Sequence, residues 1–186
     1  TKHNSSLLEP GYIHHGGGGE SSIGLLDKGS DAIRPIAENF TACGFETDVS
    51  DNVRESIWKK LFINVSASVM TGILQTNLDF LRDSGHAWKL VEQLIREAVA
   101  VANADGLAFA GEDVLRDVRT LVENARDGYT SIYADLRNGV HTEVDTINGS
   151  VVRAAKRLGI PVPAHEFVVL LVHALEDRAD AGHTPV

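Results

Sequence analysis

The stretch that decides the fold is Ile57-Trp-Lys-Lys-Leu-Phe-Ile-Asn-Val-Ser-Ala-Ser-Val-Met70, which is apolar around most of a helix. Apolar side chains on nearly all sides are typical of a helix buried in a protein core. We expect Ser50 or Asp51 to cap this helix, which should run to about Gly72. A buried central helix of this kind predicts that other helices surround it.

A polar stripe interrupts this apolar helix. Lys60, Asn64 and Ser68 recur every four residues, so at about 100° per residue they lie along one side. One interpretation is that Lys60 extends to the surface with Asn64 and Ser68 beside it. The other is that the three side chains form a polar pocket wall with an ammonium group at one end. The spacing leaves both interpretations open.

The helical pattern continues to the end of the chain. Apolar residues with a period of 3.6 predict further helices over residues 84–106, 114–122, 130–137 and 142–158, and a last one after Pro163. Asp83 or Ser84 is expected to cap the first of these. Residues 51–186 are therefore expected to form one helical, bundle-like domain.

The first fifty residues have a different pattern. Short apolar runs at 12–15, 23–26 and 45–49 favour strands, and a helix capped by Ser30 or Asp31 is expected to reach Cys43. We expect Cys43 to be a small core residue. Residues 1–50 are thus expected to be a small α/β remnant that cannot form a core of its own, placed before the helical domain.

Composition excludes several classes of function. Of 186 residues, 17 are Lys or Arg and 26 are Asp or Glu, which gives a net charge of −9. An acidic chain does not suit general binding to nucleic acid or to anionic membranes. Residues 61–74 are the longest apolar run, but polar residues break it and a membrane span needs about 20 residues. One cysteine and no apolar leader in the first ten residues favour a cytoplasmic protein.

Neither the glycines nor the histidines give a cofactor or metal motif. In Gly16–Gly19 the third glycine of G-x-G-x-x-G would fall at Ser21 or Ser22, and a strand-like run follows, so we favour a tight turn between strands. His14 and His15 are adjacent on a predicted strand and would point to opposite faces. We therefore expect no metal site and no phosphate-binding loop.

Glu143 is a second candidate for chemistry. If the helix expected over 142–158 is regular, Glu143 lies on the same side as Ile147 and Val151 and faces inward, where a carboxylate needs a cationic partner or a function. The alternative is an acid in the first helical turn, favoured by the helix dipole. Asp135 and Asn148 are expected to form hydrogen bonds between helices.

Four ordered motifs together carry a family resemblance. They are Trp58-Lys-Lys-Leu-Phe-Ile-Asn64, Thr130-Ser-Ile-Tyr-Ala-Asp135, Thr142-Glu-Val-Asp-Thr-Ile-Asn-Gly149 and Gly159-Ile-Pro-Val-Pro163. This series resembles the C-terminal domain of ketopantoate reductase (2-dehydropantoate 2-reductase), and residues 11–16 with Ile23-Gly24 resemble the last strands of that family's nucleotide-binding domain. The resemblance implies a helical domain of the 6-phosphogluconate dehydrogenase C-terminal-like class that closes over a keto acid. It implies NADPH as cofactor, bound mainly by a Rossmann domain that this sequence does not contain.

The resemblance also implies roles for individual residues. Lys60 matches the general acid that protonates the ketone oxygen, and Glu143 matches a glutamate beside substrate and cofactor that helps set the position of the lysine. Asn64 and Ser131 match substrate-binding residues. Ser68 also belongs to the substrate pocket, where well-studied members carry a second Asn, and Gly128 replaces another Asn. These two differences put ketopantoate itself in question as the substrate.

The expected function is therefore that of the C-terminal domain of an NADPH-dependent reductase, which converts 2-dehydropantoate to (R)-pantoate in pantothenate biosynthesis. The alternatives are a paralogous reductase of another 2-keto acid and a non-catalytic helical module for binding or oligomerisation. The expected partner is a small 2-keto acid substrate. The sequence also allows a homodimer. We expect the isolated chain to be inactive without the Rossmann domain.

Overall fold

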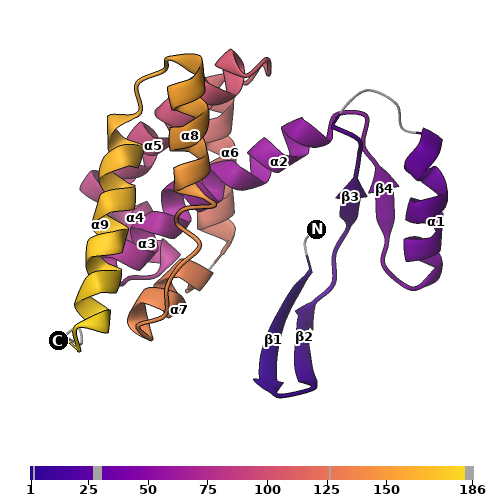
Figure 1. The fold of residues 1–186 in the computed structure, drawn as a ribbon, viewed down its shortest axis with the longest axis horizontal. Helices are drawn as coiled ribbons and strands as arrows, with labels where there is room; N and C mark the ends of the chain where they lie inside the picture. Colours follow the sequence, from indigo (N-terminus) through magenta and orange to yellow (C-terminus); the bar gives the residue numbers. More distant parts are fainter. Residues whose placement is uncertain (2, 27–30, 126, 183–186) are drawn as a thin grey trace. The chain divides into compact units, whose positions relative to one another are not determined.

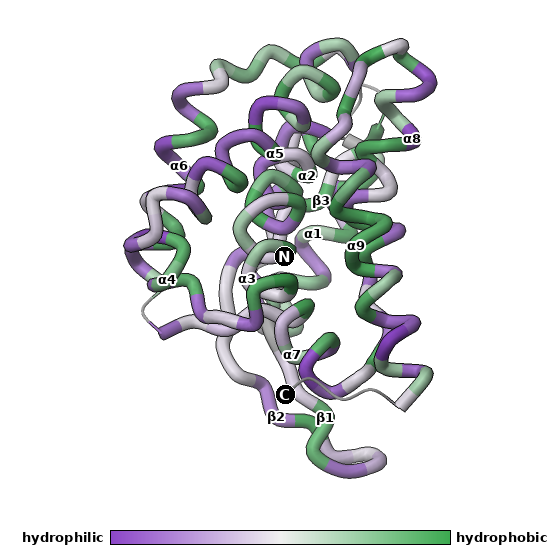
Figure 2. The backbone as a smooth tube through the Cα atoms, turned by 90° about the vertical axis from the view of Figure 1, so that its left-hand side faces the viewer, coloured by the Kyte–Doolittle hydropathy of each residue, from purple (hydrophilic) through white to green (hydrophobic). Residues whose placement is uncertain are grey.

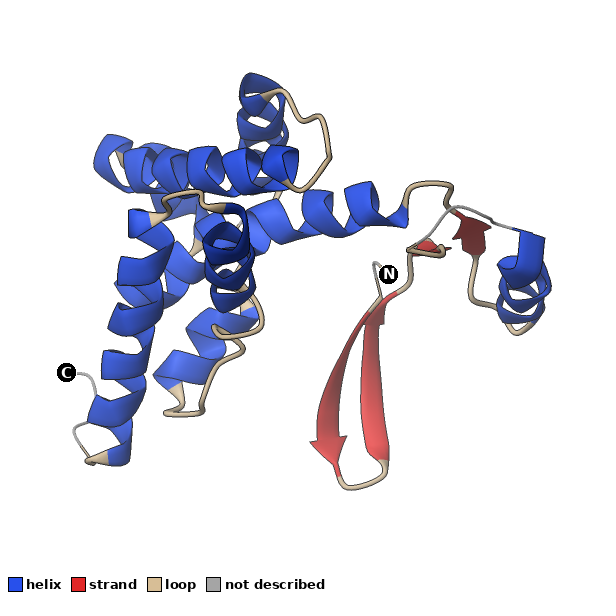
Figure 3. Ribbon diagram, turned by 45° about the horizontal axis from the view of Figure 1, so that its top comes forward, coloured by secondary structure: helices blue, strands red, loops and turns tan. Residues whose placement is uncertain are grey.

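The computed structural model describes residues 1, 3–26, 31–125 and 127–182, and the chain forms two compact units, Thr1–Ile57 and Trp58–Val186. Most of the described residues are helical, so the fold is mainly α, as the sequence predicts (Figure 3). Strands occur in the N-terminal unit (Figure 1). The helix α2 (Val53–Ile63) contributes residues to both units.

The N-terminal unit contains two separate pairs of strands. β1 (Asn4–Glu9) and β2 (Tyr12–Gly17) form an antiparallel hairpin that turns at Gly11, where a φ of +81° favours glycine. β3 (Ser21–Ile23) and β4 (Thr47–Val49) pair in parallel, and the chain between them forms the short 3-10 turn η1 (Asp31–Ile33) and α1 (Arg34–Ala42).

Several details of this unit differ from the sequence prediction. The run at 23–26 gives a strand that ends at Ile23, and β1 was not predicted. The glycine run lies between two strands as predicted, but Gly16 and Gly17 still belong to β2, and β2 and β3 belong to different sheets. Cys43 follows the end of α1 and is exposed, so its assignment to a core was wrong. Ser30, one of the two expected caps of this helix, lies outside the described residues.

The C-terminal unit is an assembly of helices around α5. Its elements after α2 are the π-helix η2 (Asn64–Ser68), α3 (Val69–Leu74), α4 (Leu78–Asp83), α5 (Gly85–Ala104), α6 (Gly111–Asn124), α7 (Ser131–Arg137), α8 (Asn148–Leu158) and α9 (Pro163–Asp180). α4 was not predicted. The helix expected over 142–158 begins only at Asn148, because residues 144–147 form turns.

The core lies where α5 meets its neighbours. α5 packs against α4, α6, α8, α9 and η2, and α8 runs beside α9 (Figure 1). The buried face of α5 repeats with helical period: Ala87, Val91, Leu94, Ile95, Ala98, Val101 and Ala102. α9 carries both hydrophobic and hydrophilic residues (Figure 2), and two of its four buried residues, His165 and Glu176, are polar or charged. Ser84 caps α5 by accepting a hydrogen bond from the Ala87 N–H at 3.3 Å, which confirms the predicted start.

A buried carboxylate joins α5 to the start of α9. The cap position of α9, Val162, has no side chain that can accept a hydrogen bond. Glu97 from α5 takes that role, since its carboxylate accepts from the backbone N–H groups of Ala164 and His165 at 3.1–3.2 Å. An anion at this position also interacts favourably with the helix dipole. The contact fixes the start of α9, and with it His165.

Candidate functional site

The candidate site is built around the π-helix η2. A π-helix bonds each N–H to the carbonyl five residues back, so it interrupts the angular spacing of an α-helix, and such segments often occur at functional sites. Val65, Ser66 and Ala67 are fully buried, whereas Asn64 and Ser68 at its two ends are half-buried. The expected stripe of Lys60, Asn64 and Ser68 thus runs from the last turn of α2 to the two ends of η2, and its shared face stays a prediction.

A local contact accompanies the change of helix type. The Ser66 hydroxyl donates a short hydrogen bond to the carbonyl of Phe62, four residues earlier. Serine hydroxyls that bond back in this way compete with the backbone ladder and bend helices. The Val65 carbonyl instead accepts a hydrogen bond at 2.8 Å from the Asn148 side chain. A buried carbonyl of η2 thus has a hydrogen-bond partner at the start of α8.

The start of α7 is attached to the far end of η2. The carbonyl of Ser68 accepts from the Thr71 hydroxyl at 2.7 Å and from the Thr130 hydroxyl at 3.4 Å, and the two hydroxyls lie 2.7 Å apart. Thr130 also caps α7, because its side chain accepts from the Tyr133 N–H. Ser131 is the first residue of α7 and its side chain is exposed. The structure therefore brings Ser131 close to the chain at Ser68.

The start of α8 is attached to η2 from another direction. Asn148 is fully buried, and its amide nitrogen lies 2.8 Å from the Val65 carbonyl and 3.2 Å from Nδ1 of His165. Nε2 of His165 lies 3.0 Å from the carbonyl of Leu94. Since a carbonyl only accepts, Nε2 carries the proton and Nδ1 accepts from Asn148. The expectation that Asn148 bonds between helices is confirmed.

The buried ring of His165 stays neutral. Burial is the main cause that lowers the pKa of His165, while its hydrogen bond to Leu94 and the charge of Glu97 act in the opposite direction. A neutral ring suits the network, because it has one donor for Leu94 and one acceptor for Asn148. This network was not predicted from the sequence; the only signal was a polar residue at a core position of the last helix.

Glu143 lies on a turn and not inside a helix. Its backbone carbonyl accepts from the N–H groups of Thr146 and Ile147, both at 3.0 Å, and its side chain is exposed. The expectation that Glu143 faces inward was wrong, because it assumed that the helix begins at residue 142. Tertiary contacts hold the chain in the turn instead: Val144 is buried, and Thr142 bonds to Glu176 on α9.

A second acid approaches Glu143 from α7. Burial raises the pKa of Asp135, and the nearby charge of Glu143 raises it further. The expected hydrogen bond between Asp135 and another helix is not found among the described residues. Asp135 and the exposed Glu143 instead place two carboxyl groups near each other, so this part of the surface is suited to a cationic or hydrogen-bond-donating group.

Lys60 lies in the last turn of α2 and is exposed. It is one turn before Asn64 on the continuous helical segment that leads into η2. An exposed ammonium is compatible with both interpretations of the polar stripe. Asn64 and Ser68 thus belong to η2, and Lys60 lies on the same helical run. Hydrogen bonds from Thr130 and Asn148 attach to η2 the segments that bear Ser131 and Glu143.

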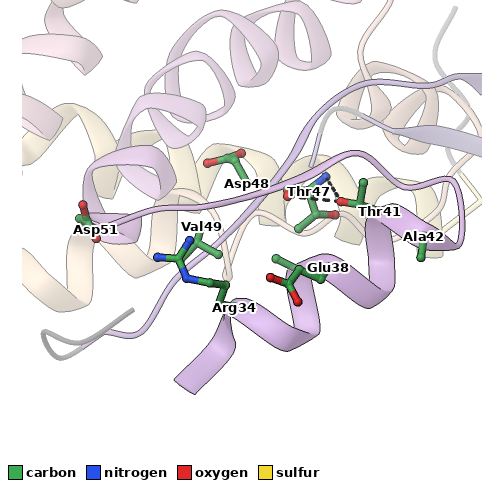
Figure 4. Close-up of a pocket in the computed structure, with 9 residues that line it drawn as sticks. Arg34, Glu38, Thr41, Ala42, Thr47, Asp48, Val49 and Asp51 are labelled. Atoms are coloured by element: carbon green, nitrogen blue, oxygen red, sulfur yellow. Dashed lines mark hydrogen bonds between the residues drawn. The ribbon is translucent and has the colours of Figure 1, made fainter. Parts of the chain in front are cut away.

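The clearest depression in the N-terminal unit is not this site. It has a volume of about 640 Å³ and lies between α1 and β4, where Thr41 accepts a hydrogen bond from the Thr47 N–H (Figure 4). Arg34 is the basic residue in its lining, against three acids, Glu38, Asp48 and Asp51. An excess of carboxylates does not suit a phosphate group.

Within the described ranges, no three His, Cys, Asp or Glu side chains are placed to bind one metal ion together. Nor is any helix in the part of the chain that the structure describes sufficiently long and apolar to cross a membrane.

Comparison with known proteins gives a consistent set of relatives. The 2-dehydropantoate 2-reductase of Halobacterium salinarum is 30% identical over 173 residues, which are 92% of this chain and 57% of that protein. The enzyme of the same name from Pyrococcus horikoshii is 28% identical, over 95% of this chain and 58% of its own length. The chain therefore spans less than two thirds of the relatives that it matches.

Solved structures give the same result. A D-mandelate dehydrogenase with NADH and anilino(oxo)acetate superposes with a TM-score of 0.87 at 28% identity, over 96% of this chain and 59% of that one. A PanE/ApbA family ketopantoate reductase from Ralstonia eutropha JMP134 gives 0.84 at 31% identity, over 96% and 58%. The family model "Ketopantoate reductase PanE/ApbA C terminal" matches residues 52–176. The chain belongs to the ketopantoate reductase family, and residues 52–176 correspond to its C-terminal domain.

Proposed function

We propose that this chain supplies the substrate-binding part of an NADPH-dependent reductase of 2-keto acids, with 2-dehydropantoate as substrate and (R)-pantoate as product. The observation that carries the proposal is the π-helix, which presents Asn64 and Ser68 at its ends and is hydrogen-bonded to the segments that bear Ser131 and Glu143. The relatives named 2-dehydropantoate 2-reductase support the reaction class. In this proposal residues 1–50 belong to a nucleotide-binding domain and 51–186 form the substrate domain.

The described residues can bind an amide or hydroxyl of the cofactor, but they do not suit its phosphates. NADPH, when bound, supplies the hydride that reduces the ketone. The exposed carboxylate of Glu143 can accept a hydrogen bond from an amide or hydroxyl of such a cofactor. The cofactor's phosphates need a glycine loop that leads into a helix, whereas the glycine run here leads into β3. We propose that the phosphates bind to a part of the whole protein outside this chain.

Lys60 is the proposed general acid. Reduction develops negative charge on the ketone oxygen, and an ammonium group aimed at that oxygen stabilises the charge and donates the proton. Asn64 and Ser68 offer an amide and a hydroxyl to the keto acid, and Ser131 offers a hydroxyl to its carboxylate. The role proposed for Glu143 is to accept a hydrogen bond close to the lysine and so limit the positions of its ammonium group.

The decisive experiment is steady-state kinetics of the whole protein. Lys60→Ala should lower kcat by 10²–10⁴-fold with little change in NADPH affinity, since its interaction develops in the transition state. Asn64→Ala should mainly raise the KM for the keto acid, because a pocket amide holds ground state and transition state alike. Lys59→Ala, the adjacent exposed lysine, is the matched control and should keep wild-type kinetics. A Lys60→Ala protein with more than about a tenth of wild-type kcat would rule out Lys60 as the acid.

A second candidate is a reductase of bulkier, aryl-substituted 2-keto acids. Ser68 is smaller than an asparagine and so leaves room for a larger substituent, whereas Gly128 adds none, since a Cβ there would lie only 2.9 Å from the Ala125 carbonyl oxygen. Tyr129, 62% exposed, pairs with Tyr133 at a ring-centroid distance of 4.6 Å beside Ser131. Exposed aromatic rings favour contact with another ring. A higher kcat/KM for phenylglyoxylate than for 2-dehydropantoate would select this candidate.

A further inference from the structure

Helix α9 holds the residue before Glu143 through a buried carboxylate. Glu176 is only 4% exposed, and its Oε1 accepts from both the backbone N–H and the hydroxyl of Thr142, each at 2.7 Å. Burial alone would raise the pKa of Glu176, but the two Thr142 bonds and the nearby His173 outweigh it, so the pKa is lowered. Glu176 is therefore an ionised acceptor that attaches Thr142 to α9.

The same helix also reaches the other side of Glu143. Nδ1 of His173 lies 3.0 Å from Oε2 of Glu176, and Nε2 lies 3.2 Å from Oδ1 of Asp145. Ionised carboxylate oxygens only accept hydrogen bonds, so each of these contacts needs a proton on the nitrogen. A neutral imidazole has one such proton and can satisfy only one contact. The geometry fits the doubly protonated ring.

We infer that His173, with both ring nitrogens protonated, is a positioning residue that clamps the turn between Thr142 and Asp145 and so fixes the backbone that carries Glu143. The role of Glu143 in the reaction rests on the proposed function; the clamp itself rests on the contacts. Its two halves differ in exposure, since the Glu176 side chain is buried and that of Asp145 is 67% exposed. Solvent competes with the Asp145 bond, which is therefore the half that is lost first.

The groups that face the ring come from α9 and from the segment before α8. They are the carboxylates of Glu176 and Asp145, and His141, whose Nδ1 lies 3.8 Å from Glu176 and whose Nε2 lies 3.0 Å from Asp180. The hydrogen bond to Glu176 is the largest cause that raises the pKa of His173, and the bond to Asp145 adds to it. As pH rises through this raised pKa, the ring loses a proton and the turn loses a bond.

The clamp can be tested on the chain without any activity. Nitrogen-15 NMR of histidine should show both His173 nitrogens protonated at pH 6, with a titration midpoint above the ordinary 6.5. Protection factors of the Thr146 and Ile147 amides should fall by about tenfold or more through that midpoint, as expected for loss of a charge-assisted bond. Asp145→Asn should lower the midpoint, and Asp177→Asn, an exposed acid on the same helix, should not. A titration midpoint of His173 at or below 6.5 would overturn the inference.

Kinetics of the whole protein test the positioning role. kcat should fall as His173 loses its proton, and Asp145→Asn should move that fall to lower pH by the same amount as the NMR midpoint. If the NMR midpoint moves and the kinetic profile of an active enzyme does not, His173 does not position Glu143 and the inference fails. A protein without reductase activity would count against the proposed function, and the amide protection factors would still decide the clamp.

Discussion

Truncation of Asn148 should destabilise the C-terminal unit strongly, although no part in the reaction is proposed for this residue. Asn148→Ala removes the donor for two buried acceptors, the Val65 carbonyl and Nδ1 of His165, at 2.8 and 3.2 Å. A buried polar group left without a partner costs about 1–3 kcal/mol, so the two cost about 2–6 kcal/mol. The Oδ1 atom of Asn148 itself has no partner among the described residues, and its removal returns part of this cost.

The net loss in the free energy of unfolding should be about 2–4 kcal/mol, including the void left by truncation. Tryptophan fluorescence in urea measures it in the right unit, because both tryptophans, Trp58 and Trp88, are buried in the C-terminal one. Asn103→Ala is the matched control: Asn103 also makes two hydrogen bonds, both to the backbone of Phe109, but it is exposed.

Water can replace the bonds of an exposed asparagine, so the control should lose less than about 1 kcal/mol. The comparison isolates burial, because the substitution and the number of bonds are the same. If Asn148→Ala costs no more than Asn103→Ala, the network of Asn148, His165 and Val65 does not hold the π-helix, and the account of the site given above is wrong.

Three further outcomes are expected. The 186-residue chain alone should not bind NADPH tightly, and micromolar affinity in calorimetry would contradict this. Because burial lowers the pKa of His165, the free energy of unfolding should decrease below about pH 6.5, by at most about 1.4 kcal/mol per pH unit from this group. His165→Gln should flatten that slope, and an unchanged slope would refute the assignment. His173 has a raised pKa and contributes with the opposite sign, but it does so equally in the wild type and in the variant. Thr130→Val should cost about 1–2 kcal/mol in urea unfolding because α7 loses its cap, whereas Thr130→Ser should stay near wild type.

Regular helices could be predicted from the sequence because their signals are local. The apolar period of α5 and the serine before it define that helix without reference to any other residue. The π-helix has no such local signal. It accepts a hydrogen bond from Asn148, which lies 83 residues from Val65 in the chain, so a pattern within residues 57–70 predicts only a continuous helix.

The candidate site shows the same division. The types of residue and their order gave the family and the candidate residues, but not their surroundings. Glu143 was assigned an inward position from the period of a helix that does not extend that far. Its real position depends on Glu176, 34 residues after Thr142, and on the burial of Val144. Tertiary contacts that shorten a helix are not visible in a periodic pattern.

Two of the residues proposed for chemistry share an arrangement whose role becomes clear only from the long-range hydrogen bonds of the structure. In two of the motifs a threonine comes directly before the candidate residue: Thr130 before Ser131, and Thr142 before Glu143. Each threonine makes a long-range hydrogen bond, to Ser68 or to Glu176, and is less exposed than the residue that follows it. The bonds fix the backbone and leave the next side chain exposed.

In this arrangement one residue fixes the backbone, and the residue next to it is left accessible to substrate. Groups that bind substrate must stay accessible, and accessible side chains contribute little to fixing their own position, because solvent competes for their hydrogen bonds. A neighbour with a long-range bond fixes the backbone for them, and in η2 the carbonyl of Val65 has this role for Asn64. Replacement of such a neighbour should therefore change the kinetic constants of the enzyme, although the adjacent candidate residue is unchanged.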